Sequence, residues 1–259
     1  LVCRAARRQV TVALSGDGGD EQFGGYNRYF WGPRIWNRLS WMPYPMRQML
    51  GAAISAVPVA GLDALVGGQG IARAGEKAHK LAACLRGARD ADDLYLSLVS
   101  EWHDPAQVVR GDDSGVVVEP PSLLGDALPA STAGDIRSRM MYRDTISYLP
   151  DDILCKVDRA AMAVGLETRV PFLDHRVAEL AWRLPLSMKL RGGLGKWALR
   201  QVLDNHVPRE LIDRPKAGFA IPIGGWLRGP LRPWAESLLD EKRLRNEGYF
   251  HPAPIRRKW

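Results

Sequence analysis

Cysteine is scarce in this sequence, and its spacing excludes several classes of protein. Cys3, Cys84 and Cys155 are the only three among 259 residues, and none has a second cysteine or a histidine at metal-ligand spacing. A disulfide-stapled scaffold and a zinc finger are therefore excluded. We expect buried, reduced thiols, which predicts a cytoplasmic location.

Long apolar runs and internal repeats are also missing. The longest apolar stretch, residues 51–67, is interrupted by Ser55, Pro58 and Asp63 and is shorter than the ~20 residues needed to cross a bilayer. No segment recurs at a fixed period, so solenoids and propellers are excluded. The sequence opens on Leu1 without a leader pattern, so we expect no membrane partner and a piece of a longer protein.

What remains is the composition of an ordinary globular protein. Apolar residues make up 46% and charged residues 25%, and the length accommodates one large or two modest domains. The formal charge is +7, carried by 28 arginines and only 8 lysines against 29 acidic residues. The basic residues are scattered singly or in small groups, so we expect a solvated basic surface and no nucleic-acid partner.

Apolar patterning predicts an α/β protein dominated by helices. Val10–Leu14 is β-branched and apolar and stops at Ser-Gly, which predicts a short strand buried on both faces in a parallel sheet. Asp104–Gly134 is rich in Gly, Pro, Ser and Asp and predicts an irregular connection. We expect the later part of an α/β domain with a helical appendage. Helices are predicted over Ile35–Leu50, Ala72–Leu85, Ala91–Glu101, Ile136–Tyr148, Pro150–Val164 with Gly165 as its stop, Asp174–Leu184, Lys196–Asn205 and Leu231–Asp240.

The most informative segment is the acidic loop, Ser15–Glu21, which directly follows the predicted strand. Its three glycines allow a tight turn with exposed amide groups, and ligands bind where parallel strands end. Its carboxylates would repel a bare phosphate unless Mg²⁺ lies between them. The pattern favours a nucleotide and metal loop, with an ordinary Gly/Asp turn as the alternative.

Two further segments carry charge in distinctive surroundings. Arg214–Phe219 places Lys216 in a rigid, glycine-flanked turn, where a lysine either meets charge on a phosphate or is merely exposed to solvent. Between Val157 and Asp174, four charged residues are embedded in apolar sequence. We interpret them as partly buried groups that pair with partners to tie a helix and its following turn to the core: Asp158, Arg159, Glu167 and Arg169.

Taken together, four segments resemble the synthetase half of the glutamine-hydrolysing asparagine synthetases. They are SGDGGDEQFGGYNRY at 15–29, LPDDILCKVDRAAMAVGLETRVPFLD at 149–174, GKWALR at 195–200 and RPKAGFAIPIGGWL at 214–227. The resemblance implies a nucleotide α-hydrolase-like (HUP/PP-loop ATPase) α/β domain, of which residues 1–259 form a partial, mostly helical piece with a short parallel strand.

The resemblance also implies roles for individual residues. Ser15, Gly16 and Gly18 match positions that contact ATP, and Asp20 matches a ligand of magnesium and pyrophosphate. Asp17 stands where many members carry Glu, at a position important for forming and using the adenylate, and its shorter side chain leaves a general-base role open. Lys216 matches the lysine that stabilises charge on the α-phosphate.

The implied reaction is ATP-dependent amidation of aspartate through an aspartyl adenylate, with Mg²⁺ as cofactor. Ammonia would come from glutamine in an amino-terminal glutaminase domain, and a homodimer stays open. The family's Ser-Gly-Gly-x-Asp-Ser pyrophosphate loop and amino-terminal catalytic cysteine do not occur here, so we expect this chain alone to be inactive. The alternatives are a β-lactam-synthetase-like or other enzyme that adenylates another carboxylate, and a non-catalytic interaction module of the same fold.

Overall fold

The protein is mostly helical, with one short parallel sheet. The computed structural model describes residues 1–59, 61, 63, 74–100, 102, 105–111, 129, 132, 134–212 and 222–259. The chain divides into two compact units, one of Leu1–Ser100 with Leu123–Pro208 and one of Glu101–Ser122 with Arg209–Trp259. Each unit is described by itself below.

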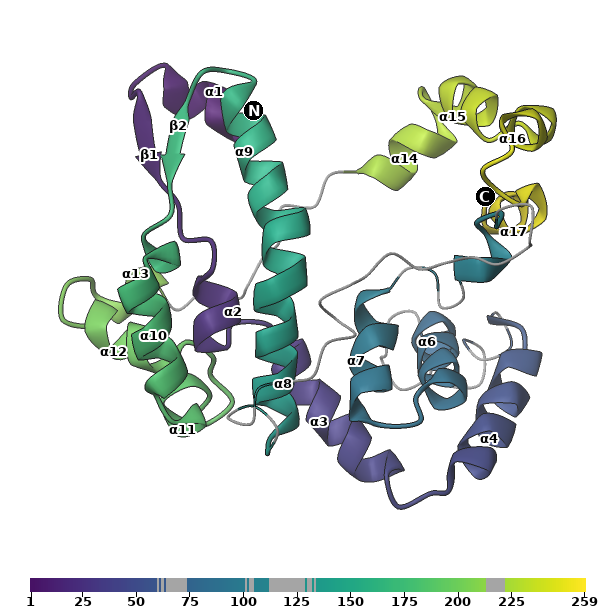
Figure 1. Cartoon of the computed structure of the whole chain (residues 1–259), viewed down its shortest axis with the longest axis horizontal. Coiled ribbons are helices and arrows are strands. Elements are labelled where there is room, and N and C mark those ends of the chain that lie inside the picture. Colours follow the sequence, from purple (N-terminus) through teal and green to yellow (C-terminus); the bar gives the residue numbers. More distant parts are fainter. Residues whose placement is uncertain are drawn as a thin grey trace. The chain divides into compact units, whose positions relative to one another are not determined.

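The first unit contains both strands and most of the helices (Figure 1). They run in the order α1 (Val2–Arg7), β1 (Val12–Leu14), α2 (Gly19–Phe23), α3 (Arg28–Leu39), α4 (Tyr44–Ala56), α6 (Ala74–Gly87), α7 (Ala91–Val99), α8 (Ile136–Arg143), η5 (Asp144–Leu154), α9 (Cys155–Met162), β2 (Glu167–Arg169), η6 (Pro171–Leu173), α10 (His175–Arg183), α11 (Leu186–Lys189) and α12 (Trp197–Leu203).

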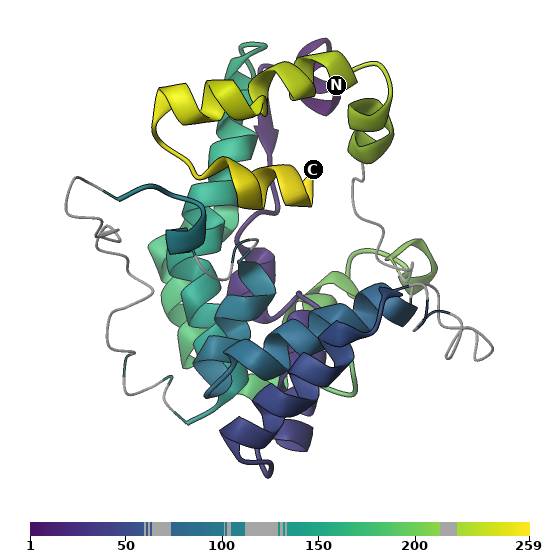
Figure 2. The same ribbon diagram turned by 90° about the vertical axis from the view of Figure 1, so that its right-hand side faces the viewer.

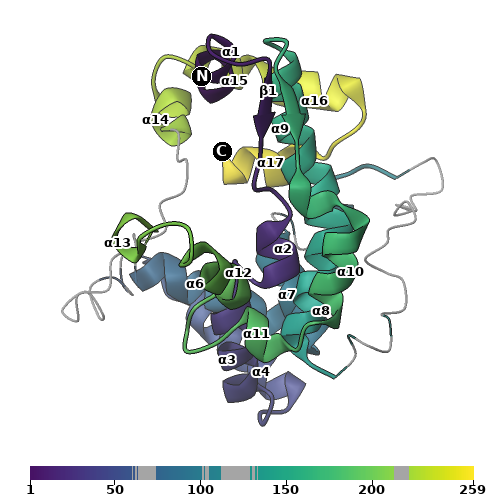
Figure 3. The ribbon, with the colours of Figure 1, turned by 90° about the vertical axis from the view of Figure 1, so that its left-hand side faces the viewer.

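The predicted strand is present and parallel, but it is not buried on both faces. Strand β1 pairs with β2 in the register Val12↔Glu167 to Leu14↔Arg169, beside α9 (Figure 3). Leu14 is 74% exposed and Val12 is 37% exposed. The apolar run anticipates a sheet covered on both sides, whereas β2 is the only strand in the described residues that pairs with β1.

A continuous helix replaces the two helices that were predicted to be separated at Pro150. Segments α8, η5 and α9 follow one another without a break, and Pro150 lies inside the π-helical η5. A π-helix has wider turns than an α-helix, which gives room for a ring without an N–H group. The hydroxyl groups of Thr145 and Ser147 donate to the carbonyl oxygens of Met141 and Arg143 at 2.8 and 2.7 Å, one turn upstream. The predicted stop is confirmed, since Gly165 has φ +67° after the end of α9.

The predicted helix Ile35–Leu50 is also wrong, because it is two helices. Helix α3 ends at Leu39 and α4 begins at Tyr44, after Pro43 in an extended conformation with ψ 145°. Proline disfavours a helical conformation in the residue before it, so Pro43 separates the two helices. The expected helices that correspond to α6, α7, α10, α12 and α15 are confirmed with small shifts at their ends. Most of Asp104–Gly134 lies outside the described residues.

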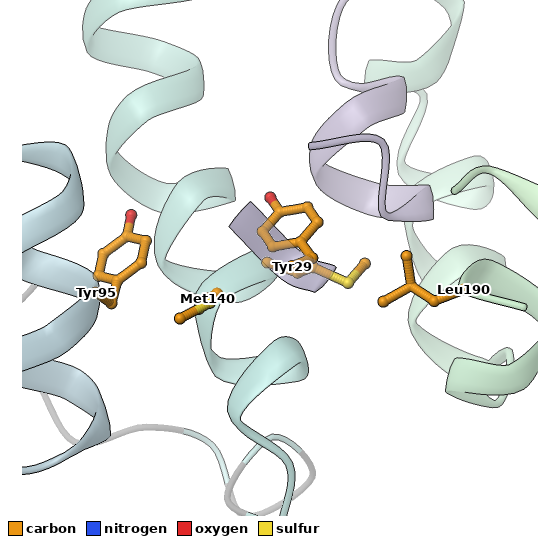
Figure 4. Close-up of a cluster of buried hydrophobic side chains, with 5 residues drawn as sticks. Tyr29, Tyr95, Met140 and Leu190 are labelled. Atoms are coloured by element: carbon orange, nitrogen blue, oxygen red, sulfur yellow. The ribbon is translucent and has the colours of Figure 1, made fainter. Parts of the chain in front are cut away.

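The core of the first unit lies where α3, α7 and α8 meet the end of α11. Figure 4 shows Tyr29 among Tyr95, Met140 and Leu190, and all four side chains are buried. Nearby, α4 and α6 lie side by side (Figure 2), and Gly51 approaches α6 so closely that a Cβ atom would be 2.7 Å from the carbonyl oxygen of Ala82. Each large apolar side chain buried in this way contributes ~1.5–3 kcal/mol.

The second unit consists of short helices. They are η2 (Pro105–Gln107), α13 (Arg209–Ile212), α14 (Ile223–Arg228), α15 (Arg232–Leu238), α16 (Glu241–Glu247) and α17 (Pro252–Lys258). Its two chain segments are joined where His251 N donates to Val108 O at 2.7 Å and where the Lys258 ammonium lies 4.2 Å from the centre of the Trp102 ring.

The cysteines and the lengths of the helices are the next features of the described residues. All three cysteines are free thiols, as predicted, although only Cys84 is buried, while Cys3 and Cys155 are half-buried. In the part of the chain that the structure describes, no helix is both long enough and apolar enough to span a membrane.

Candidate active site

The acidic loop leaves the carboxyl end of β1 and leads directly into α2. Gly18 has φ +82°, and a Cβ atom there would lie 3.1 Å from the Leu173 side chain, so both the backbone conformation and the space favour glycine. Among the described residues, no atom other than those of Gly16 and its two chain neighbours lies within 4 Å of the place where a Cβ atom of Gly16 would be. The backbone at Gly16 is therefore open to the approach of a ligand.

The two aspartates of the loop have different partners. The hydroxyl group of Ser15 donates a hydrogen bond to Asp17 Oδ2, which orients that carboxylate beside the end of the strand. Asp20 Oδ1 lies 3.1 Å from the ammonium nitrogen of Lys196, and both side chains are half-buried. A cation from a distant part of the sequence thus balances one negative charge of the loop.

The pairing of Asp20 with Lys196 depends on two glycines. A Cβ atom at Gly25 would overlap the Asp20 carboxylate and would lie 2.5 Å from Cε of Lys196. A Cβ atom at Gly195 would overlap the carbonyl oxygen of Gly24. Lys196 itself has φ +56°, and its backbone N–H donates to Phe23 O at 3.0 Å. Close backbone packing therefore brings the lysine to the loop.

The third acidic residue of the loop, Glu21, is buried and has a different partner from the two aspartates. Glu21 is only 1% exposed, and its carboxylate accepts a hydrogen bond of 2.6 Å from the Tyr26 hydroxyl. Burial raises the pKa of Glu21, and the hydrogen bond from Tyr26 opposes that rise. Burial, together with the neighbouring Glu21, raises the pKa of the Tyr26 hydroxyl. Glu21 therefore supports the start of α2 and is not placed to hold a metal ion.

A buried ion pair joins Arg28, at the start of α3, to Asp144 of η5. Asp144 is fully buried and accepts hydrogen bonds from Arg28 Nε and Nη2 at 2.9 and 2.7 Å, and from the hydroxyl groups of Tyr29 and Tyr95 at 2.5 and 2.8 Å. The Arg28 guanidinium also lies 4.2 Å from the centre of the Tyr26 ring. Burial and the charge of Asp144 raise the pKa of both Tyr29 and Tyr95, so both hydroxyl groups remain donors.

The structure therefore brings together most of the predicted site. Five of the six residues lie in the acidic loop or at the first turn of α2: Ser15, Gly16, Asp17, Gly18 and Asp20. Lys216 lies outside the described residues, so its approach to the aspartates stays a prediction. No group of three or more His, Cys, Asp or Glu side chains that could hold a metal ion occurs among the residues described.

Sequence reasoning missed Lys196 and misjudged four charges. The GKWALR segment contains Lys196, but nothing local indicates that its partner is Asp20. The charged residues expected to be partly buried are exposed instead, and two of them, on β2, pair with each other at 2.6 Å. Those four residues are Asp158, Arg159, Glu167 and Arg169, and they are exposed because the strand and the end of α9 are covered on one side only.

An acidic, glycine-rich turn at the carboxyl end of a parallel strand is a position where α/β proteins place ligands, so the fold and the loop define an α/β protein with a candidate ligand site there. The family is then shown by comparison. The chain belongs to the asparagine synthase family, whose sequence model matches residues 1–259.

Individual relatives agree with that family. A putative glutamine-hydrolysing asparagine synthetase of Mycobacterium tuberculosis H37Rv is 36% identical over 236 residues, which are 91% of this chain and 33% of the relative. Glutamine-hydrolysing asparagine synthetase 1 of Bacillus subtilis is 28% identical over 97% of this chain and 37% of its own length. The human asparagine synthetase is 34% identical over 48% of this chain. No solved structure matches.

The match covers only part of each relative. The chain spans about a third of the length of the bacterial relatives that it matches. The family assignment therefore describes this chain and not the activity of the complete relatives.

Proposed function

We propose that this chain is part of an asparagine synthetase and that the complete protein activates aspartate with ATP in a nucleotide α-hydrolase-like α/β domain to which this chain contributes. A carboxylate is a poor electrophile for ammonia until one of its oxygens becomes a good leaving group. Transfer of AMP from ATP to that oxygen releases pyrophosphate and gives aspartyl adenylate. Ammonia released from glutamine then attacks the acyl carbon, AMP leaves, and asparagine forms.

The observation that carries this proposal is the arrangement of the acidic loop. Asp17 is oriented by Ser15, Asp20 is held by Lys196, and the backbone at Gly16 is open at the end of β1. In the proposal, Ser15, Gly16 and Gly18 position ATP, and Asp17 acts at the reacting centre. Fixed groups of this kind stabilise developing charge more effectively than water, because they need no reorganisation.

The donor set of the loop fits magnesium. Mg²⁺ prefers oxygen ligands and is usually held by one or two carboxylates together with substrate phosphates and water. Asp20 supplies such a carboxylate. When bound, the ion neutralises charge on the phosphates. Lys196 orients the Asp20 carboxylate.

Lys216 completes the proposed machinery as the cation that meets negative charge on the α-phosphate. Its loop, Arg214–Phe219, is outside the described residues, so its role rests on the match of RPKAGF to the family. A second lysine, Lys196, forms an ion pair with Asp20. In the proposal, Lys196 positions Asp20 and Lys216 stabilises charge on the α-phosphate.

The test is asparagine formation by the complete gene product that contains this chain, supplied with aspartate, ATP, Mg²⁺ and glutamine or ammonium. Asp20→Asn and Lys216→Met are each expected to lower turnover by ~10²–10³-fold, the usual cost of removing a preorganised charge. Lys242→Met, an exposed lysine of α16, is the matched control and should leave turnover unchanged. Wild-type turnover in Asp20→Asn would contradict the proposal.

The choice of carboxylate is tested separately. Pyrophosphate release is measured with aspartate, glutamate, a β-amino acid and a sugar acid, and the proposal expects release with aspartate alone. Release with another carboxylate would assign a related adenylating enzyme instead. The chain by itself is expected to release no pyrophosphate in the presence of aspartate, and robust turnover would refute that expectation.

A further inference from the structure

A cavity in the first unit lies outside the acidic loop. It has a volume of about 290 Å³ and is formed by α3, the start of α8 and the turn after α11. This volume is at the lower end of the ~300–1,000 Å³ typical of ligand pockets. Its polar lining comes from Arg34, Asn37, Arg137, Arg191, Gly192 and Gly193, and no carboxylate of a described residue lines it.

The charge of this cavity is not balanced. Arg137 is paired with Asp135 through hydrogen bonds of 2.7 and 3.0 Å. Arg34 and Arg191 are both exposed to solvent. The Arg34 side chain forms no hydrogen bond or ion pair with a described residue, and the Arg191 guanidinium lies 4.7 Å from the centre of the Trp197 ring with no carboxylate partner among the described residues. Two positive charges from two different elements therefore line one cavity, and no anion among the described lining residues neutralises them.

Backbone amides add to this positive lining. Arg191 and Leu194 exchange backbone hydrogen bonds of 3.0 and 2.9 Å, which closes a tight turn. Gly192 and Gly193 occupy its centre with φ +58° and +80°, the pattern of a type I′ turn. Their N–H groups donate to no described residue. Amide groups exposed in a turn of this kind are suited to bind an anion.

We propose that this cavity binds a phosphate-type dianion, either free phosphate or the phosphate group of a small metabolite. The guanidinium groups of Arg34 and Arg191 match two negative charges, and their forked N–H groups suit phosphate oxygens. The apolar floor, formed in part by Tyr29 and Leu190, limits the ligand to a small one. The site is separate from the proposed ATP site, since none of its lining residues belongs to the acidic loop.

A bound dianion would tie α3 to the turn after α11. That turn follows Leu190, whose side chain packs so closely on Gly24 that a Cβ atom there would lie 2.7 Å from Leu190 Cδ2. The same stretch continues to Lys196, the partner of Asp20. The ligand therefore binds to a segment that also supports the acidic loop, and its binding is expected to raise the unfolding temperature of the first unit.

The test is calorimetric titration of the complete gene product that contains this chain with inorganic phosphate, at low ionic strength and without Mg²⁺. Arg34→Gln and Arg191→Gln are each expected to weaken binding by at least ~10-fold, because each removes charge-assisted hydrogen bonds. Arg38→Gln is the matched control, since Arg38 is an exposed arginine on the same helix that does not line the cavity. Asp17→Asn with Asp20→Asn should bind phosphate as the wild type does.

The outcomes separate the alternatives. Tighter binding of phosphoserine than of inorganic phosphate assigns a phosphorylated metabolite, and the reverse order assigns free phosphate. A phosphomonoester should bind more weakly below its second pKa of ~6, where it carries one charge fewer. The proposal is overturned if phosphate does not bind, if Arg34→Gln binds as the wild type does, or if Arg38→Gln loses as much affinity.

Discussion

Replacement of Asp144 by Asn should be among the most destabilising single changes in this chain. The Asp144 carboxylate is fully buried and accepts four hydrogen bonds, two of them from Arg28, whose side chain is only 17% exposed. Asparagine keeps the shape but leaves the Arg28 charge without its counter-ion in a low-dielectric site. Breaking a buried pair in this way costs about 3–5 kcal/mol, a large part of the ~5–15 kcal/mol stability of a typical domain.

Urea unfolding followed by circular dichroism measures this cost. Glu179→Gln is the control, because its ion pair with Arg183 is exposed and spans 3.5 Å, and its loss should cost under ~0.5 kcal/mol. The double variant Arg28→Met, Asp144→Leu should be more stable than Asp144→Asn, since it leaves no buried charge unpaired. The reasoning is refuted if Asp144→Asn loses less than ~1 kcal/mol, or if the double variant is no more stable than Asp144→Asn.

Three other changes have distinct expected outcomes. Gly25→Ala should displace Asp20 and Lys196, lowering asparagine formation by the complete gene product ~10²-fold while costing only ~1 kcal/mol of folding free energy in urea unfolding. Burial lowers the pKa of Lys189 from 10.5 to about 8, so the folded chain loses this proton at a lower pH than the unfolded chain does. The free energy of unfolding should therefore rise by about 3 kcal/mol between pH 8 and 10.5. Lys189→Met should lack that rise in unfolding measurements across this pH range and should be the more stable protein at pH 7. Gly225→Ala should raise the stability of α14 by ~0.5–1 kcal/mol in thermal unfolding, because among the described residues no atom outside its own helix and chain neighbours lies within 4 Å of the new Cβ atom.

The parts of this protein that could be predicted from the sequence are those determined by residues that are close together in the chain. The apolar run before Ser15 predicts β1, and the glycines and aspartates that follow predict the acidic loop, because strand ends and tight turns depend on local composition. Gly165 likewise predicts the end of a helix, and its φ of +67° confirms it. These features need no knowledge of distant contacts.

Other features could not be predicted because they depend on distant residues. Lys196 reaches Asp20 only after the chain has folded through α3 to α11, and Asp144 finds Arg28 in the same way. Pro150 ends helices in most contexts, so its place inside η5 reflects wide turns that a local pattern does not reveal. The burial of β1 was misjudged because an apolar sequence indicates what a strand prefers, and the exposure depends on which elements pack against it.

The exposed strands have a practical consequence for work with the purified chain. The apolar side chains of Leu14 and Val12 are exposed on the two-stranded sheet. In the described residues no third strand pairs with either outer edge of that sheet. Unpaired peptide groups along such edges act as a template for strands from neighbouring molecules. At high concentration the purified chain should therefore associate into oligomers through this sheet edge. Sedimentation velocity at several concentrations would measure this association before any binding experiment.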